Sequence, residues 1–128
     1  MPGSASRWLA EELARALTTH RVPGNAVAGG LAVDKNRAGM IMAGGAALTG
    51  EEEERGALLL NILVRLEVRC GHDPALIAEL LDTPTSLLDD CSPIEAIAAG
   101  ELRRVREAVV ELRALDMRWS RIGHQRRA

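Results

Sequence analysis

The chain has 128 residues, a length typical of one domain or of two very small ones. Hydrophobic residues make up 47% of it, with 20 Ala and 18 Leu but no Phe or Tyr. Because Ala and Leu favour helices whereas aromatic residues favour sheets, we expect an all-α protein. The net charge is only −2, no apolar run reaches the roughly 18 residues of a membrane span, and residues 1–7 do not resemble a signal peptide. These features predict a cytoplasmic protein with no membrane partner.

The N-terminal part predicts three helices. Apolar residues recur at three- and four-residue steps over residues 6–20, and Pro23 ends that pattern. Two short helices are expected over 25–31 and 35–43, with a tight turn between them. Asp34 is well placed to cap the second of these.

This pair of short helices has the features of a helix-turn-helix. Such a unit needs a small residue early in its second helix, a buried aliphatic residue after the turn, and polar side chains at the start of the recognition helix. Ala28 and Val33 meet the first two needs. The candidate DNA-binding residues are Lys35, Asn36, Arg37 and Met40, since these basic and amide groups can contact phosphates or base edges. The alternative, favoured by three glycines between residues 29 and 39, is a compact helical hairpin that does not read DNA.

Residues 49–70 predict a long helix. Thr49 and Glu52 match a capping box at its start, where acidic residues also suit the helix dipole. Its middle, 58–66, is apolar around most of its circumference, so the helix must be covered on several sides. In a chain this short, a second copy of the chain in a homodimer is one way to bury these apolar faces. The expected interface residues are Leu58, Leu59, Ile62, Leu63 and Leu66.

Three further helices are expected after residue 71. Asp73 and Pro74 mark the start of one that reaches about residue 82, and a loop follows. Ser92 and Glu95 match a second capping box, and Gly100 ends that brief helix. The last helix has an apolar stripe formed by Leu102, Val105, Val109 and Leu112. We therefore divide the chain into a helix-turn-helix-like region, 1–47, and a region of 48–128 that contains the central helix, a C-terminal helical domain and a basic tail.

Charge is unevenly distributed along the chain. Residues 45–100 contain eleven acidic and three basic residues, whereas 101–128 contain eight arginines and four acidic residues. This asymmetry suggests surfaces with different partners. The alternative is that these helix faces are simply solvated and happen to differ in the sign of their charge. The glycine pairs lack the spacing of a phosphate-binding loop, and Cys70, His72 and Cys91 do not match zinc-ligand spacing. We therefore expect no enzyme activity, no cofactor and no metal.

A family resemblance rests on runs in the second region. The helix opens at Leu48-Thr49-Gly50-Glu51-Glu52, and Leu80-Leu81-Asp82-Thr83-Pro84, Ser92-Pro93-Ile94-Glu95 and Gly100-Glu101 follow in order. This arrangement resembles the Xre/MbcA/ParS family of bacterial antitoxins over residues 25–115, most specifically over 81–101. The chain departs from the family pattern at Thr85, where asparagine is usual, and at Asp89-Asp90-Cys91, where Gly-Gly-Arg or a close variant is usual.

The resemblance implies an Xre-like helix-turn-helix followed by a toxin-binding domain. It also implies a RES-domain toxin as partner, which degrades NAD or transfers its ADP-ribose, and operator DNA as a second partner through which the antitoxin represses its own promoter. The expected toxin-binding residues lie in the acidic loop, the last helix and the tail: Asp89, Asp90, Glu101, Arg104, Arg118, Arg121, Arg126 and Arg127. The alternatives are a stand-alone dimeric DNA-binding regulator and a helical protein-interaction module without DNA binding.

Overall fold

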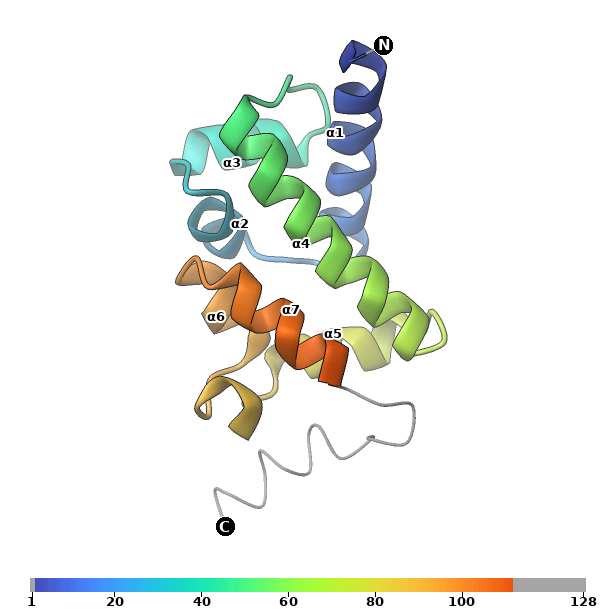
Figure 1. The fold of residues 1–128 in the computed structure, drawn as a ribbon, viewed down its shortest axis with the longest axis vertical. Coiled ribbons are helices and arrows are strands. Elements are labelled where there is room, and N and C mark those ends of the chain that lie inside the picture. The colour runs from blue at the N-terminus through green and yellow to red at the C-terminus, as the bar shows by residue number, and fades with distance from the viewer. Residues whose placement is uncertain (1, 112–128) are drawn as a thin grey trace.

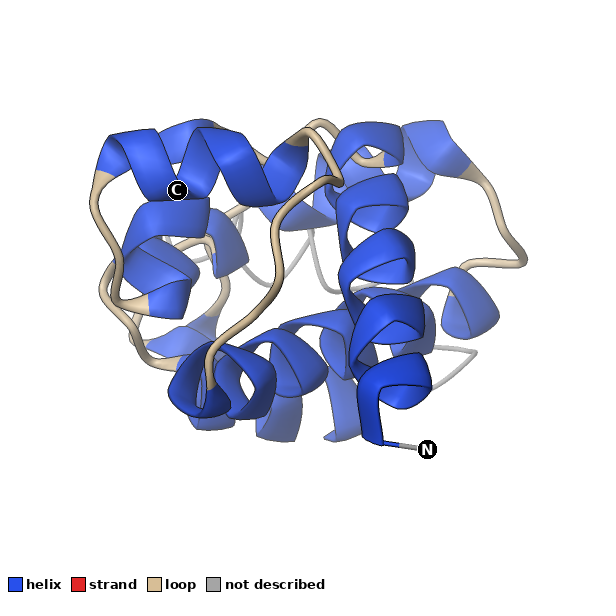
Figure 2. Cartoon of the chain, turned by 90° about the horizontal axis from the view of Figure 1, so that it is seen from above, coloured by secondary structure: helices blue, strands red, loops and turns tan. Residues whose placement is uncertain are grey.

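The computed structural model consists of helices and loops (Figures 1 and 2), which confirms the all-α prediction. It describes the backbone of residues 2–111 and the side chains from Arg7 onward. Leu112 and four expected toxin-binding residues, Arg118, Arg121, Arg126 and Arg127, lie outside this range. Within it the elements are α1 (Pro2–Thr19), α2 (Gly24–Leu31), α3 (Lys35–Met42), α4 (Gly50–Arg69), α5 (Pro74–Asp82), a 3₁₀ turn η1 (Ser86–Leu88), α6 (Pro93–Ala98) and α7 (Leu102–Glu111).

Local capping signals set the helix starts, as predicted. At α4 the Thr49 hydroxyl accepts a hydrogen bond from the backbone N–H of Glu52, and the Glu52 carboxylate accepts one from the backbone N–H of Thr49. Ser92 and Glu95 form the same reciprocal pair at α6. Each capping box satisfies two N–H groups that the first turn of a helix leaves without partners.

The turn between α2 and α3 is tight because one residue adopts the left-handed conformation. Ala32 has φ 57°, and the N–H of Val33 reaches back to the carbonyl of Ala28 at 2.9 Å. The Asp34 carboxylate then caps α3 by accepting from the N–H of Arg37 at 2.7 Å. Gly29 lies on the face of α2 that meets α6, where a Cβ atom would stand 1.9 Å from a backbone carbonyl oxygen. Glycine is therefore required there for close packing.

The central helix α4 is covered by the chain itself. Helices α1 and α7 pack along it, and α2 and α5 touch it at other points. Four of the five expected interface residues are at most 1% exposed within the single chain: Leu59, Ile62, Leu63 and Leu66. The expected dimer interface is therefore wrong for these four residues, because the apolar circumference of α4 faces its own core. Leu58 is half-buried against that core.

The buried side chains form one cluster that runs from α1 to α7. Helix α1 packs on α4, and α2 packs on α6, so both regions of the expected division contribute to it. The boundary at 47/48 lies in the loop between α3 and α4. Residues on both sides of this boundary contribute to the same buried cluster.

Candidate protein-binding site

The loop between α5 and α6 has a fixed shape. Thr85 is fully buried and its backbone N–H donates to the carbonyl of Cys91 at 3.1 Å, which closes the loop at its base. The Thr85 hydroxyl accepts from the N–H of Leu87 at 3.3 Å and starts η1. Leu88, 2% exposed, anchors the turn in the core. Backbone hydrogen bonds and the buried Leu88 thus hold the loop, whereas Leu87, Asp89 and Asp90 are exposed.

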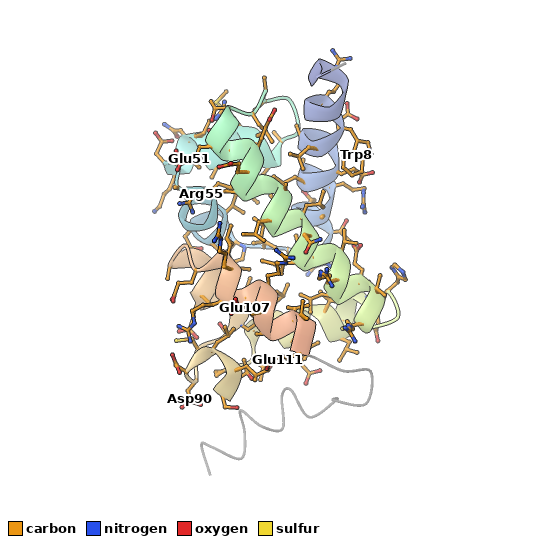
Figure 3. All side chains as sticks on the ribbon, in the orientation of Figure 1. Trp8, Glu51, Arg55, Asp90, Glu107 and Glu111 are labelled. Carbon is orange, nitrogen blue, oxygen red and sulfur yellow. The ribbon has the colours of Figure 1, made fainter. Side chains whose placement is uncertain are left out.

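Two adjacent aspartates form the tip of this loop. Asp89 and Asp90 both have positive φ, 55° and 68°, a conformation that aspartate tolerates better than most residues with a side chain. The Asp89 side chain is 81% exposed, and Leu87 beside it is an exposed apolar residue. In Figure 3 Asp90 lies at the lower edge of the molecule, away from α4. The loop therefore presents carboxylates and one apolar side chain to solvent.

Arg104 of α7 ties the loop to the last helix. Its guanidinium donates to the Asp89 carboxylate at 2.6 Å and to the Glu101 carboxylate at 3.0 Å. These hydrogen bonds raise the pKa of Arg104 above its ordinary value. Three of the expected toxin-binding residues thus come together, and Asp90 is their direct neighbour. Arg104 acts within the chain as a support for the loop, since its donors already meet two carboxylates.

A groove runs beside this cluster, between α4 and α7. Its upper part has a volume of about 570 Å³ and is lined by Glu51, Glu54, Arg55, Leu58, Glu101, Arg103 and Arg104, among others. A second hollow of about 630 Å³ shares two of these residues and continues along α7 past Arg106, Glu107 and Glu111. Figure 3 labels four of the lining residues, Glu51 and Arg55 on α4 and Glu107 and Glu111 on α7. Both acidic and basic side chains line it, which suits a mixed-charge protein surface better than a polyanion.

Sequence reasoning missed Arg55 and Arg103. Their place in one groove follows from the packing of α7 on α4, a contact between segments far apart in the chain. The available signal was the strong amphipathic pattern of α7, whose polar side carries arginines at 103 and 106.

The expected DNA-binding residues have two different environments. Lys35, Asn36 and Met40 are exposed on α3. Arg37 instead binds inside the molecule: its guanidinium donates to the two Glu52 carboxylate oxygens at 2.9 and 2.7 Å and to a loop carbonyl at 2.6 Å. Its assignment to DNA is therefore corrected, because this side chain fastens α3 to the start of α4.

The Arg37 contact changes the chemistry of Glu52. The hydrogen bonds from Arg37 lower the pKa of Glu52 from 4.5 to about 2, against the opposing effect of burial, and the N–H of Thr49 adds to the lowering. Glu52 therefore stays ionised at neutral pH. The pair is a fixed structural link between α3 and α4.

Comparison of the chain with protein-family models, curated proteins and solved structures gave no match. The resemblance to Xre/MbcA/ParS antitoxins therefore remains a prediction that rests on the short runs quoted above. Among residues 2–111, no His, Cys, Asp and Glu side chains gather in a group of three or more that could hold a metal ion. No helix in the same range is both long and apolar enough to cross a membrane.

Proposed function

We propose that the chain is a protein-binding antitoxin that neutralises a RES-domain toxin by direct contact, as the resemblance implies. The observation that supports this proposal is the rigid acidic loop between α5 and α6. It falls in the part of the chain where the resemblance is most specific, and it holds an apolar residue and two carboxylates outward in one place. Preformed loops of this kind lose little conformational entropy when a partner binds.

The chemistry of the loop defines the partner surface that fits it. The carboxylate of Asp89, which Arg104 holds in place, and the exposed Asp90 favour a partner surface with arginine or lysine side chains, and the exposed Leu87 favours an apolar pocket beside them. A cleft that binds the phosphates of NAD carries positive charge, and this positive charge also attracts carboxylates. The acidic loop is thus suited to occlude such a cleft, and Arg104 of α7 holds it in place.

Operator binding is a second candidate function. It is favoured by the exposure of Lys35, Asn36 and Met40 at the start and middle of α3, directly after a tight turn. With Arg37 committed to Glu52, and with Glu51, Glu53 and Glu54 in the first turns of the adjoining α4, this surface has little net positive charge. We therefore expect at most weak DNA binding, whose salt dependence would reflect few phosphate contacts.

Co-expression in bacteria tests the proposal. The chain is produced together with the RES-domain protein encoded beside it, and growth is measured for the wild type and for a Leu87→Arg, Asp90→Asn double variant. Asparagine tolerates the positive φ at position 90, so the fold is kept while charge and apolar contact are removed.

We expect the wild type to restore growth and the double variant to fail, although circular dichroism shows it folded. Glu11→Arg, on the exposed side of α1, is the matched control and should restore growth fully. Full rescue by the loop variant, or the lack of a RES-domain partner that the wild-type chain binds, would overturn the proposal. A parallel filter-binding assay with the promoter fragment upstream of the chain decides the second candidate.

A further inference from the structure

The groove between α4 and α7 is lined by charged side chains that are only partly paired. Two ion pairs form inside it, Glu51 with Arg55 and Glu101 with Arg104. The other charged side chains that line it form no ion pair among the described residues: Glu54, Glu107, Glu111, Arg103 and Arg106. Carboxylates are in excess among these five, so an occupant of the groove should carry more positive than negative charge.

The groove also has an apolar part, and it lies where the described chain ends. Leu58 is half-buried and Val110 is 44% exposed, and both line the second hollow. The guanidinium of Arg69 lies 3.5 Å from the backbone carbonyl oxygen of Val110, which ties the last turn of α7 to α4. The next residue, Glu111, ends α7 and lines the same hollow. The chain therefore leaves the described range from within the groove.

The sequence that follows α7 combines apolar and basic residues. Its apolar residues recur at steps of three, four and three: Leu112, Leu115, Trp119 and Ile122. They continue the spacing of Leu102, Val105 and Val109, which are buried in α7. Such residues contribute free energy only where a surface covers them. The same segment has an excess of positive charge, with five arginines and one aspartate: Arg113, Arg118, Arg121, Arg126, Arg127 and Asp116.

We propose that residues 112–128 fold back and dock in the groove between α4 and α7 of their own chain. Trp119 and its apolar neighbours cover Leu58 and Val110, and the arginines of the segment pair with the unpaired carboxylates of the groove. This contact does not depend on the antitoxin proposal. It would hold the tail arginines that are expected to bind a toxin against the body of the free chain.

Length and attachment favour this occupant over a second copy of the chain. The 10 residues of α7 extend over about 15 Å, and a short turn followed by the rest of residues 112–128 can return over that distance in helical or extended form. Because the segment is joined directly to α7, its effective concentration at the groove is in the millimolar range. A second copy at micromolar concentration cannot compete with it.

The fluorescence of Trp119 in the full chain provides the first test. Trp8, which is 59% exposed, is replaced in a Trp8→Phe variant so that Trp119 is the single tryptophan. Docking predicts a blue-shifted emission and several-fold weaker acrylamide quenching than in urea. Both signals should be the same at nanomolar and micromolar protein concentration, because the occupant belongs to the same chain. Emission equal to that of the unfolded chain, or shielding that is lost on dilution, would refute the proposal.

A charge reversal tests whether Trp119 is shielded in this groove. Glu107→Arg combined with Glu111→Arg, in the Trp8→Phe chain, should shift the emission to the red and raise quenching towards the value in urea. Cooperative unfolding in urea checks that this variant is folded. The matched control is Glu11→Arg combined with Glu79→Arg, which makes the same change in charge at two exposed carboxylates outside the groove and should leave both signals unchanged. Shielding that survives the groove variant, or that is lost equally in the control, would overturn the proposal.

Discussion

Replacing Glu52 by glutamine removes a charge and keeps a cap. The carboxylate of Glu52 serves two purposes, since it accepts from the N–H of Thr49 and pairs with the guanidinium of Arg37. Glutamine at this position still closes the capping box with its carbonyl oxygen. The variant therefore isolates the ion pair that joins α3 to α4.

The size of the loss follows from the pKa of Glu52. A pKa lowered from 4.5 to about 2, chiefly by the hydrogen bonds from Arg37, corresponds to about 3 kcal/mol of stability at neutral pH. The side chains of the pair are 26% and 10% exposed, so water screens part of it and we expect about 2 kcal/mol for Glu52→Gln. Because the folded-state pKa is lowered, this contribution is complete above pH 4.5 and is lost as the pH falls through about 2.

Urea unfolding followed by far-ultraviolet circular dichroism measures the difference. At pH 7 the variant should unfold at lower urea with an unchanged slope, and the gap between the two proteins should close as the pH approaches the Glu52 pKa. Glu11→Gln, an exposed carboxylate on α1, is the control and should change stability by less than about 0.5 kcal/mol. A gap that is absent at pH 7, or one that persists unchanged to the lowest pH, would refute the role given to this pair.

Three further changes test other contacts. Gly29→Ala should lower the free energy of unfolding in urea by about 3 kcal/mol, because its Cβ would stand 1.9 Å from a backbone oxygen of α6. Gly39→Ala should raise the free energy of unfolding by up to about 1 kcal/mol, because the space around Gly39 is open. His20→Ala should cost about 2 kcal/mol in thermal unfolding, since it removes a buried hydrogen bond of 2.7 Å to Glu67 and leaves that carboxylate partly buried. Arg104→Ala should speed hydrogen exchange in the loop before α6 without changing exchange in α4.

Helix starts can be predicted from the sequence where the capping residues lie close together in the chain. Thr49 with Glu52, and Ser92 with Glu95, lie three residues apart, so the capping chemistry is complete within one turn and each helix start could be read directly. The start of α1 was placed too late, at Ser6 instead of Pro2, because the apolar periodicity begins only after several helical residues.

Packing partners could not be read in the same way. The apolar pattern of 58–66 predicts that α4 is covered, but the same pattern is compatible with a second chain or with the helices α1 and α7 of its own chain. The sequence predicts a DNA contact for Arg37, whereas the structure pairs it with Glu52, which is 15 residues away and meets it only through the fold. The acidic loop was found by motif, whereas its support by Arg104 depends on the α7 contact.

The pairing of α1 with α4 has a consequence for synthesis on the ribosome. Leu13 of α1 packs against Gly56 of α4, and α2 packs against α6, so both helices have main partners that emerge later in the chain. Helix α3 contacts both of them, but part of each apolar face stays uncovered until α4, and then α6, have been added. Non-local contacts of this kind slow folding and prolong exposure of apolar surface. A nascent chain stalled before residue 93 would thus be a substrate for chaperones, although Asp34, Thr49 and Asp73 already cap α3, α4 and α5.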